Sequence, residues 1–132
     1  MKTLIVEDDF ICRKMLQTFL TEFGSTDVAV NGVEALAAVS IAIEENDPYN
    51  LICLDILMPE LDGHEVLKQI RADEEDRGIL SSGEVKIIMT TSLKDLKNMS
   101  EAFRSLCDGY ISKPVDRAVL KETIEKIGLS VG

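Results

Sequence analysis

Leu51-Ile52-Cys53-Leu54-Asp55 places four apolar residues in a row before a carboxylate, and this stretch decides the fold. A short apolar run without in/out alternation is typical of a strand that helices cover on both faces. Most of the other candidate strands have the same character. The five candidates are Thr3–Val6, Asp27–Val30, Leu51–Leu54, Val85–Thr90 and Gly109–Ser112.

Amphipathic stretches that are predicted to be helices lie between these runs. The first has apolar residues at every fourth position, and the glycine that follows is predicted to end the helix. These residues are Ile11, Met15, Phe19 and Phe23, with Leu16 and Leu20 beside them, and then Gly24.

Asn31 and Asp62 each have a glutamate three residues further on, which is the spacing of a capping box. Each is therefore predicted to begin a helix, and the helix after Asn31 should reach about residue 45. A fourth helix is expected from about Asp95 to Ser105. The last helix should begin after Pro114, whose fixed φ suits a first helical turn, and should end near Gly128.

Strand and helix thus alternate five times along the chain. Such alternation predicts an α/β fold, in which right-handed crossovers place helices on both faces of a parallel sheet. We expect a single domain over residues 1–132 with its core in residues 2–128. Residues 73–84 are longer than a usual connection, and we expect an extended, exposed loop there with a short helical turn at Ile79–Ser81.

The composition is that of one ordinary globular domain, with 45% hydrophobic and 29% charged residues among 132. The net charge of −10 argues against a nucleic-acid-binding surface. Two acidic runs, Glu44–Asp47 and Asp73–Asp76, are interpreted as solvated loop charge. We interpret Cys12, Cys53 and Cys107 as buried, reduced thiols. With no signal peptide and no membrane span predicted, a cytoplasmic protein is expected.

Polar side chains follow four of the predicted strands. In an open α/β sheet, ligands bind beyond the carboxyl ends of the strands, where the strand order reverses. Acids, hydroxyls and a cation are therefore expected to meet at one edge of the sheet. They are Glu7, Asp8 and Asp9 after the first strand, Asp55 after the third, Thr91 and Ser92 after the fourth, and Lys113 after the fifth.

Each of these residues, taken alone, is also open to a structural role. Asp8 or Asp9 could cap the first helix, Asp55 could be a turn carboxylate, and Thr91 or Ser92 could cap the fourth helix. Their joint occurrence in this order favours a functional site.

Closely packed carboxylates need a counter-charge. Two of them ~4 Å apart repel by about 4 kcal/mol at an effective dielectric constant of ~20. Glu7, Asp8 and Asp55 are therefore tolerable together only with a cation or a protonated acid. All-oxygen ligands and an incoming phosphate select Mg²⁺. Asp55 would then act as a nucleophile in phosphoryl transfer, while Lys113 and Thr91 hold the other phosphoryl oxygens.

Four motifs in combination carry a family resemblance. The chain resembles response-regulator receiver domains, the CheY-like family of two-component signalling, over roughly residues 2–128. The resemblance implies a flavodoxin-like, doubly wound (βα)5 fold whose parallel five-stranded sheet has the order 2-1-3-4-5. The motifs are Leu4-Ile5-Val6-Glu7-Asp8-Asp9, Leu54-Asp55-Ile56-Leu57-Met58-Pro59 with Asp62-Gly63, Ile88-Met89-Thr90-Thr91-Ser92, and Asp108-Gly109-Tyr110-Ile111-Ser112-Lys113-Pro114.

The resemblance also implies a metal-binding set. Family members often have an arginine five residues beyond the second acid of the pair. Arg13 fixes that register, so the pair is Glu7 and Asp8, and the acid after them lies outside it. Asp8 and Asp55 would bind Mg²⁺ directly, Glu7 through water, and the backbone carbonyl of Leu57 would be the third protein ligand.

The remaining implied roles concern phosphorylation and its readout. Asp55 is the expected phospho-acceptor, Thr91 matches the family's hydroxyl and Ser92 the small residue after it. Lys113 matches the family's lysine, and its peptide bond to Pro114 is expected to be cis. Tyr110 matches the aromatic residue whose inward rotation reports phosphorylation, although an ordinary core aromatic is the alternative.

The resemblance implies a phospho-accepting response regulator. It would take a phosphoryl group from the phospho-histidine of a sensor kinase or a histidine phosphotransfer protein. The surface of the fourth helix, fifth strand and fifth helix would then change for an unknown downstream protein. No turnover of external substrates is expected, no nucleic acid or membrane partner is expected, and a bacterial source is expected.

Two leucines depart from the pattern of fast-resetting relatives. Leu57 and Leu93 occupy positions that flank the path of hydrolytic water and are often polar in those relatives. We therefore predict a long-lived phosphorylated state. His64 lies early in the third predicted helix, and we expect it on the exposed helix surface rather than in a phosphorelay.

Three alternative functions fit the sequence less well. A phosphohydrolase of the haloacid dehalogenase class needs an aspartate two residues after the nucleophile, where this chain has Leu57. A flavodoxin-type binding module needs glycines in the first strand–helix turn, where Glu7 and Asp8 stand. A receiver that folds but is never phosphorylated is disfavoured because every site residue is present.

Overall fold

The computed structural model describes the backbone of residues 1–58 and 61–129 and confirms the predicted α/β architecture. Five parallel strands pair in the order β2-β1-β3-β4-β5, as the resemblance implied. The strands are β1 (Lys2–Val6), β2 (Ser25–Ala29), β3 (Leu51–Asp55), β4 (Lys86–Thr91) and β5 (Gly109–Ser112). The helices are α1 (Phe10–Thr21), α2 (Gly32–Glu44), α3 (Gly63–Asp76), α4 (Leu93–Lys97), α5 (Glu101–Arg104) and α6 (Arg117–Lys126).

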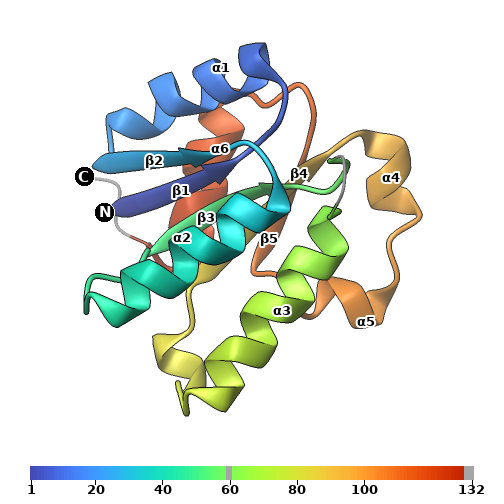
Figure 1. The fold of residues 1–132 in the computed structure, drawn as a ribbon. Coiled ribbons are helices and arrows are strands. Elements are labelled where there is room, and N and C mark those ends of the chain that lie inside the picture. Colours follow the sequence, from blue (N-terminus) through green and yellow to red (C-terminus); the bar gives the residue numbers. More distant parts are fainter. Residues whose placement is uncertain (59–60, 130–132) are drawn as a thin grey trace.

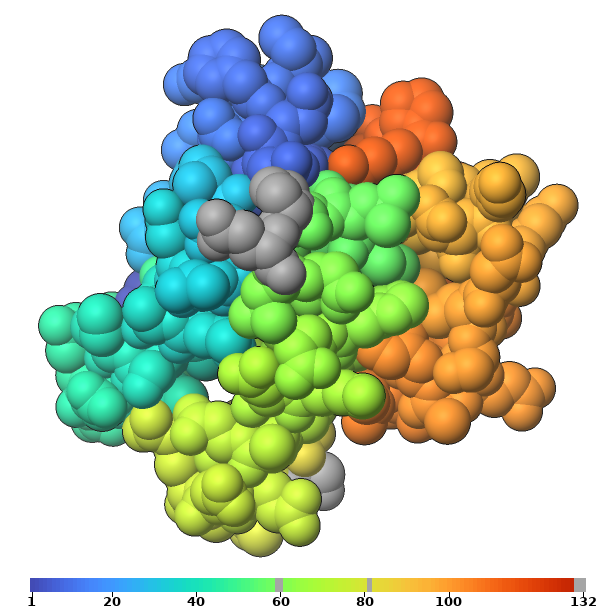
Figure 2. All heavy atoms as spheres, turned by 45° about the vertical axis from the view of Figure 1, so that its right-hand side comes forward, coloured from blue at the N-terminus to red at the C-terminus, as the bar shows by residue number. Residues whose placement is uncertain are grey.

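Helices cover both faces of the sheet (Figure 1). One face carries α1 and α6, and the other carries α2, α3 and the α4–α5 segment, which is the face seen in Figure 2. Two apolar clusters result, one on each face. The larger is built around Leu4, Val6, Ile52, Leu54, Ile87 and Met89, and the smaller around Ile5, Leu16, Leu20, Cys53, Ile88 and Leu120.

The strand β2 is an exception to the expected double burial. It is the edge strand next to β1, and exposed Ser25 and Asp27 alternate with more buried residues along it. An edge strand with one face toward solvent shows this alternation. The prediction of near-continuous burial therefore holds for the central strands, where β3 is buried throughout, and is wrong for β2.

The buried side of α1 differs from the predicted stripe. Leu16 and Leu20 are fully buried, whereas Ile11 is 71% exposed. Residues spaced by four drift around a helix with 3.6 residues per turn, so a long series of them cannot all face the core. The helix also ends at Thr21, before Gly24. The glycine is required there because a Cβ atom would lie 1.8 Å from the carbonyl oxygen of Met1.

Asn31 and Asp62 cap α2 and α3 as predicted, since each side chain accepts a hydrogen bond from the backbone N–H of the residue three positions on.

The last helix begins later than expected. Asp116 is its N-cap, and its Oδ1 accepts from the N–H groups of Ala118 and Val119. Pro114 thus precedes the helix and is not part of its first turn.

The predicted fourth helix is broken into two. Asn98 ends α4, and Ser100 takes an extended conformation in which its side chain accepts from the N–H of Phe103 and so begins α5. Serine and asparagine compete with helical hydrogen bonds and favour caps, which explains the break. Met99, between them, is buried.

The exposed connection that we expected over residues 73–84 is shorter than predicted. The helix α3 continues to Asp76, and a 3-10 turn occupies Ser81–Gly83 rather than Ile79–Ser81. Between them the chain is exposed at Arg77, Gly78 and Leu80, and Gly78 turns it with a φ of 72°. Glu74, interpreted as solvated charge, is 3% exposed. By contrast, the acids of Glu44–Asp47 are exposed as expected.

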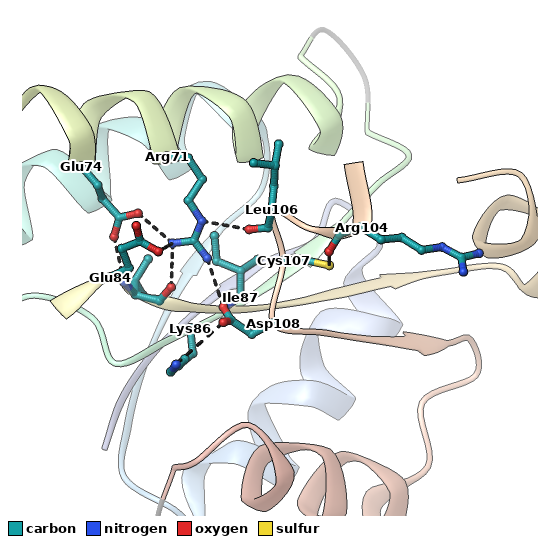
Figure 3. A network of polar contacts seen from close by, with 10 residues as sticks. Arg71, Glu74, Glu84, Lys86, Ile87, Arg104, Leu106, Cys107 and Asp108 are labelled. Atoms are coloured by element: carbon teal, nitrogen blue, oxygen red, sulfur yellow. Dashed lines mark hydrogen bonds and ion pairs between the residues drawn. The ribbon is translucent and has the colours of Figure 1, made fainter. Parts of the chain in front are cut away.

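A polar network centred on Arg71 explains why Glu74 is buried (Figure 3). Arg71 Nη1 donates to Glu74 Oε1 at 2.7 Å and to the Val85 carbonyl at 2.9 Å, while Glu74 Oε2 accepts from the Val85 N–H. Arg71 Nη2 donates to Asp108 Oδ2, which also accepts from the N–H of Ile87. The network thereby joins α3, the start of β4 and the turn before β5, at the sheet edge opposite Asp55.

Cysteine burial agrees with the prediction only for Cys53, which is fully buried, while Cys12 and Cys107 are half-buried. All three are free thiols. Burial raises the pKa of Cys53 to about 12, and that of Cys12 to about 11. Within the described ranges, none of the helices has the length and apolar character needed to cross a membrane.

Candidate phosphorylation site

Three predicted acids meet at the carboxyl edge of the sheet. Glu7 and Asp8 follow β1, and Asp55 is the last residue of β3. One carboxylate oxygen from each lies within 4.8 Å of the others. Glu7 and Asp55 are buried, at 0% and 3% exposure, whereas Asp8 is exposed, so the cluster opens to solvent on the side of Asp8.

Lys113 joins this cluster from the end of β5. Its Nζ lies 2.6 Å from Glu7 Oε1 and 3.4 Å from Asp55 Oδ1. Burial lowers the pKa of Lys113, but the two carboxylates outweigh that effect and the pKa is raised. The backbone N–H of Lys113 donates to the Thr91 carbonyl, and the peptide bond from Lys113 to Pro114 is cis, as predicted.

The electrostatic balance of the site is unfavourable to a third negative charge. Burial raises the pKa of Asp55 to about 7, with a further contribution from Glu7, while Lys113 acts in the opposite direction. One ammonium group therefore does not neutralise three carboxylates. Oxygen ligands with excess negative charge suit a divalent cation such as Mg²⁺, so the residues present fit the metal that the sequence predicted.

The backbone around Asp55 is tightly held. Its Oδ1 accepts from the N–H of Leu57 at 3.3 Å, and the N–H of Ile56 donates to the Thr90 carbonyl in β4. The N–H of Gly63 donates to the Ile56 carbonyl at 2.8 Å. A Cβ atom at Gly63 would lie 2.4 Å from the Asp55 carbonyl oxygen, so only glycine allows α3 to begin so close to the acid.

Arg13 and Asp9 organise the turn that carries Glu7 and Asp8. Arg13 Nη1 donates to the carbonyl oxygens of Glu7 at 3.1 Å and Asp8 at 3.3 Å. Asp9 caps α1, because its side chain accepts from the Cys12 N–H. The structure therefore agrees with the register inferred from Arg13, in which Asp9 lies outside the acid pair.

Two threonines end β4 beside the acid cluster. Thr90 is the residue opposite Asp55 in the parallel register, and Thr91 is buried immediately after it. The Thr90 Oγ1 is buried and has no hydrogen-bond partner within the described part of the chain. Sequence reasoning singled out only Thr91, because the register of β3 against β4 is set by packing and not by the motif. The following residue, Ser92, caps α4 by accepting from the Asp95 N–H.

Tyr110 and Thr91 share one face of the sheet. Tyr110 is opposite Met89 and Ser112 is opposite Thr91, and paired residues of neighbouring strands point to the same side. Tyr110 is 46% exposed, so it is not an ordinary core aromatic. The guanidinium carbon of Arg104 lies 5.3 Å from the centre of its ring, a contact that the sequence did not indicate.

The two predicted modulating residues stand at the same edge as the acids. Leu57 is 61% exposed and Leu93, the first residue of α4, is 55% exposed. His64 is exposed on α3 as predicted, and its ring also packs on Phe103 of α5 with 4.0 Å between ring centres. Pro59, part of the second motif, lies outside the described residues.

Comparison with known proteins agrees with this architecture. Residues 3–125 match the model of the response regulator receiver domain. The chemotaxis protein CheY of Halobacterium salinarum is 35% identical over 127 residues, which cover 96% of this chain and 95% of that protein. Four other curated relatives are longer, and the chain spans between 7% and 54% of their length.

Two solved structures at above 30% identity are also similar. One is the Saccharomyces cerevisiae co-crystal structure of the histidine phosphotransfer protein Ypd1 with the receiver domain of its downstream response regulator Ssk1. The matched chain has a TM-score of 0.80 and 32% identity, with coverage of 97% of this chain and 88% of that one. The other is the Thermotoga maritima response regulator TrrA in complex with Mg²⁺-BeF, with a TM-score of 0.74, 31% identity, and coverage of 96% and 97%.

Proteins of yeast and other eukaryotes are among these relatives. The comparisons therefore do not support the bacterial source that we expected. The family match, by contrast, extends over nearly the whole chain and includes every strand that supplies the site. This chain belongs to the family of response regulator receiver domains.

Proposed function

We propose that this chain is a single receiver domain over residues 1–132 that accepts a phosphoryl group on Asp55 with the help of Mg²⁺. The observation that carries the proposal is the placement of Asp55. It is 3% exposed, it shares a cluster with Glu7 and Asp8, and its Oδ1 lies 3.4 Å from the Lys113 ammonium. A buried carboxylate at the carboxyl edge of a parallel sheet, with both a cation and metal-ligand oxygens beside it, suits nucleophilic chemistry.

Four groups would hold the metal. Asp8, Asp55 and the backbone carbonyl of Leu57 would be direct ligands, and Glu7 would act through water. Bound there, Mg²⁺ supplies positive charge that neutralises phosphoryl oxygens. The Thermotoga relative crystallised with Mg²⁺-BeF supports this assignment.

The proposed reaction is a transfer from histidine to aspartate. An oxygen of the Asp55 carboxylate attacks the phosphorus atom of a phospho-histidine, the new P–O bond forms as the P–N bond breaks, and the electron pair of that bond returns to the imidazole nitrogen. Lys113 and the Thr91 hydroxyl bind the remaining phosphoryl oxygens. Positioning and charge stabilisation supply most of what such a transfer needs.

The donor that we propose is a sensor histidine kinase or a histidine phosphotransfer protein. The yeast receiver crystallised with its phosphotransfer protein supports the second class. We do not expect turnover of small phosphate esters, because Leu57 stands two residues after Asp55, where a hydrolase needs an acid.

The proposed output is a change in the face formed by α4, β5 and α6. The helix α6 is the last helix of the chain and corresponds to the fifth helix predicted from the sequence. Thr91 would move toward the phosphoryl oxygens, and Tyr110 would rotate into the space that it leaves. The position of both side chains on one face of neighbouring strands supports this coupling. A partner that binds the two arrangements with different affinity would read the switch.

Intact-mass measurement tests the proposal. The protein is incubated with acetyl phosphate and Mg²⁺, and we expect the mass to rise by one phosphoryl group. Asp55→Ala and wild-type protein with EDTA should show no gain. Asp9→Asn is the matched control, since Asp9 is a neighbouring acid that caps α1, and it should be labelled like wild type. Labelling of Asp55→Ala would refute the assignment.

A further inference from the structure

Arg104 connects three elements of the proposed switch region. It lies in the last turn of α5, and its Nη2 donates to the Leu96 carbonyl of α4 at 2.6 Å. The same guanidinium lies over the Tyr110 ring of β5, 5.3 Å from its centre. This reach back to α4 exists because the chain breaks between α4 and α5 at Asn98–Ser100.

The contact with Arg104 favours the outward position of Tyr110. A guanidinium within about 6 Å of an aromatic ring centre is attracted to the face of the ring. Tyr110 is 46% exposed in this position and borders a cleft of about 330 Å³ that Leu96, Pro114 and Val119 also line. Rotation of the ring toward Thr91 would separate it from the guanidinium.

An unsatisfied donor on Arg104 weakens this contact, so that it can be broken. The Arg104 Nε is buried and has no hydrogen-bond partner in residues 1–58 and 61–129. An arginine donor that has lost water without gaining an acceptor disfavours the arrangement that buries it. Two contacts of Arg104 therefore favour the outward position of Tyr110, namely the contact with its ring and the hydrogen bond to the Leu96 carbonyl. The unsatisfied Nε donor disfavours it.

We propose that Arg104 is a positioning residue that acts as a latch, holding Tyr110 outward and the end of α4 in place until Asp55 is phosphorylated. The inference rests on the proposed function, because it concerns the regulation of the same switch. Removal of an exposed cation–π contact changes a two-state population about two- to fivefold. The apparent affinity for a ligand that selects the switched state should tighten by the same factor.

Tyr110 can be observed directly because the chain has two tyrosines and no tryptophan. In a Tyr49→Phe background labelled with 3-fluorotyrosine, Tyr110 is the only fluorinated side chain of the protein, and its aromatic ¹⁹F signal is followed apart from the signals of fluoride and beryllofluoride. Arg104→Met keeps the aliphatic stem and removes the donors, and Arg104→Gln decides the matter if the methionine variant does not fold. Lys97→Gln, at an exposed site in α4, is the matched loss of one positive charge.

Two readings are taken from each protein. The first is the H₂O/D₂O isotope shift of the ¹⁹F signal before any addition, which reports how exposed the ring is. The second is the midpoint of a titration with beryllofluoride and Mg²⁺. For Arg104→Met we expect a smaller isotope shift and a midpoint tightened about two- to fivefold, with Lys97→Gln unchanged.

The latch is overturned if Arg104→Met matches its parent in both readings, or if Lys97→Gln shifts them equally. Failure of the proposed function looks different. In that case beryllofluoride changes no spectrum, including that of the parent protein, while the isotope shift measured beforehand still decides whether Arg104 holds the ring outward.

Discussion

The ammonium group of Lys113 lies 2.6 Å from Oε1 of Glu7, nearer than its 3.4 Å distance to Asp55. The lysine proposed to bind a phosphoryl oxygen is thus paired with an acid that has no exposed surface. Charge in this pocket is unbalanced, since two further carboxylates share one ammonium group.

Asp55 should make the metal-free protein less stable as the pH rises. The pKa of this carboxyl is raised from 3.8 to about 7 by burial and by Glu7, so the folded chain binds the proton more tightly than the unfolded chain. Between these values unfolding releases a proton, so the free energy of unfolding falls with increasing pH, and the roughly two units from pH 5 to the folded pKa correspond to a fall of about 2.7 kcal/mol at most. Asp55→Asn should lose this dependence in urea unfolding at pH 5 and pH 8 with EDTA present.

The control for this measurement is Glu125→Gln, which removes an exposed carboxylate from α6. It should keep the wild-type pH dependence. Parallel curves for wild type and Asp55→Asn would show that Asp55 does not hold a raised pKa in the fold.

Mg²⁺ should stabilise the protein through Asp8 and not through Asp9. A ligand at a hundred times its dissociation constant adds about 2.7 kcal/mol to the free energy of unfolding. We expect this gain in wild type and its loss in Asp8→Asn. Asp9→Asn keeps a side-chain oxygen that can accept from the Cys12 N–H and cap α1, so it should begin near wild-type stability and should still respond to the metal. Equal responses of the two variants would remove Asp8 from the metal site.

Thr91 should couple phosphorylation to the position of Tyr110. Thr91→Ala is expected to accept a phosphoryl group from acetyl phosphate. Phosphorylation should then no longer change the Tyr110 signal, and a partner should no longer distinguish the phosphorylated from the unphosphorylated protein. Thr90→Val is the matched variant, since Thr90 lies opposite Asp55 in the adjacent strand. It should retain the coupling, and a Thr91→Ala protein that still switches would contradict the proposed mechanism.

Leu57 should lengthen the life of the phosphorylated state. It is 61% exposed at the carboxyl edge of the sheet, where an apolar side chain would exclude or misorient the hydrolytic water. A Leu57→Asn protein should lose its phosphoryl group at least about tenfold faster, because the amide can orient that water. Leu80→Asn changes a 75% exposed leucine elsewhere and should have no effect. Equal rates for wild type and Leu57→Asn would refute the prediction.

The sheet and most of the site could be predicted from the sequence because those features depend on residues that are close together along the chain. Apolar runs that end in acids marked β1 and β3, and the motifs located Lys113 with its cis peptide bond. Parallel topology then brings the strand ends together without any further information. This is why the grouping of Glu7, Asp8 and Asp55 could be expected before the structure was known.

The features that were missed depend on contacts between distant residues. The burial of Glu74 needs Arg71, Val85 and the turn at Asp108, which no local pattern connects. The break between α4 and α5 depends on Ser100 capping a second helix, and the contact of Arg104 with Tyr110 exists only because of that break.

The most direct test of the central claim is to map the phosphoryl group to a residue. After reaction with acetyl phosphate and Mg²⁺, reduction with borohydride converts a phosphorylated aspartate into homoserine, and peptide mass spectrometry locates the change. We predict homoserine at position 55 and at no other acid of the cluster. Modification of Glu7 or Asp8 in place of Asp55, or a phosphoryl group on His64, would contradict the account.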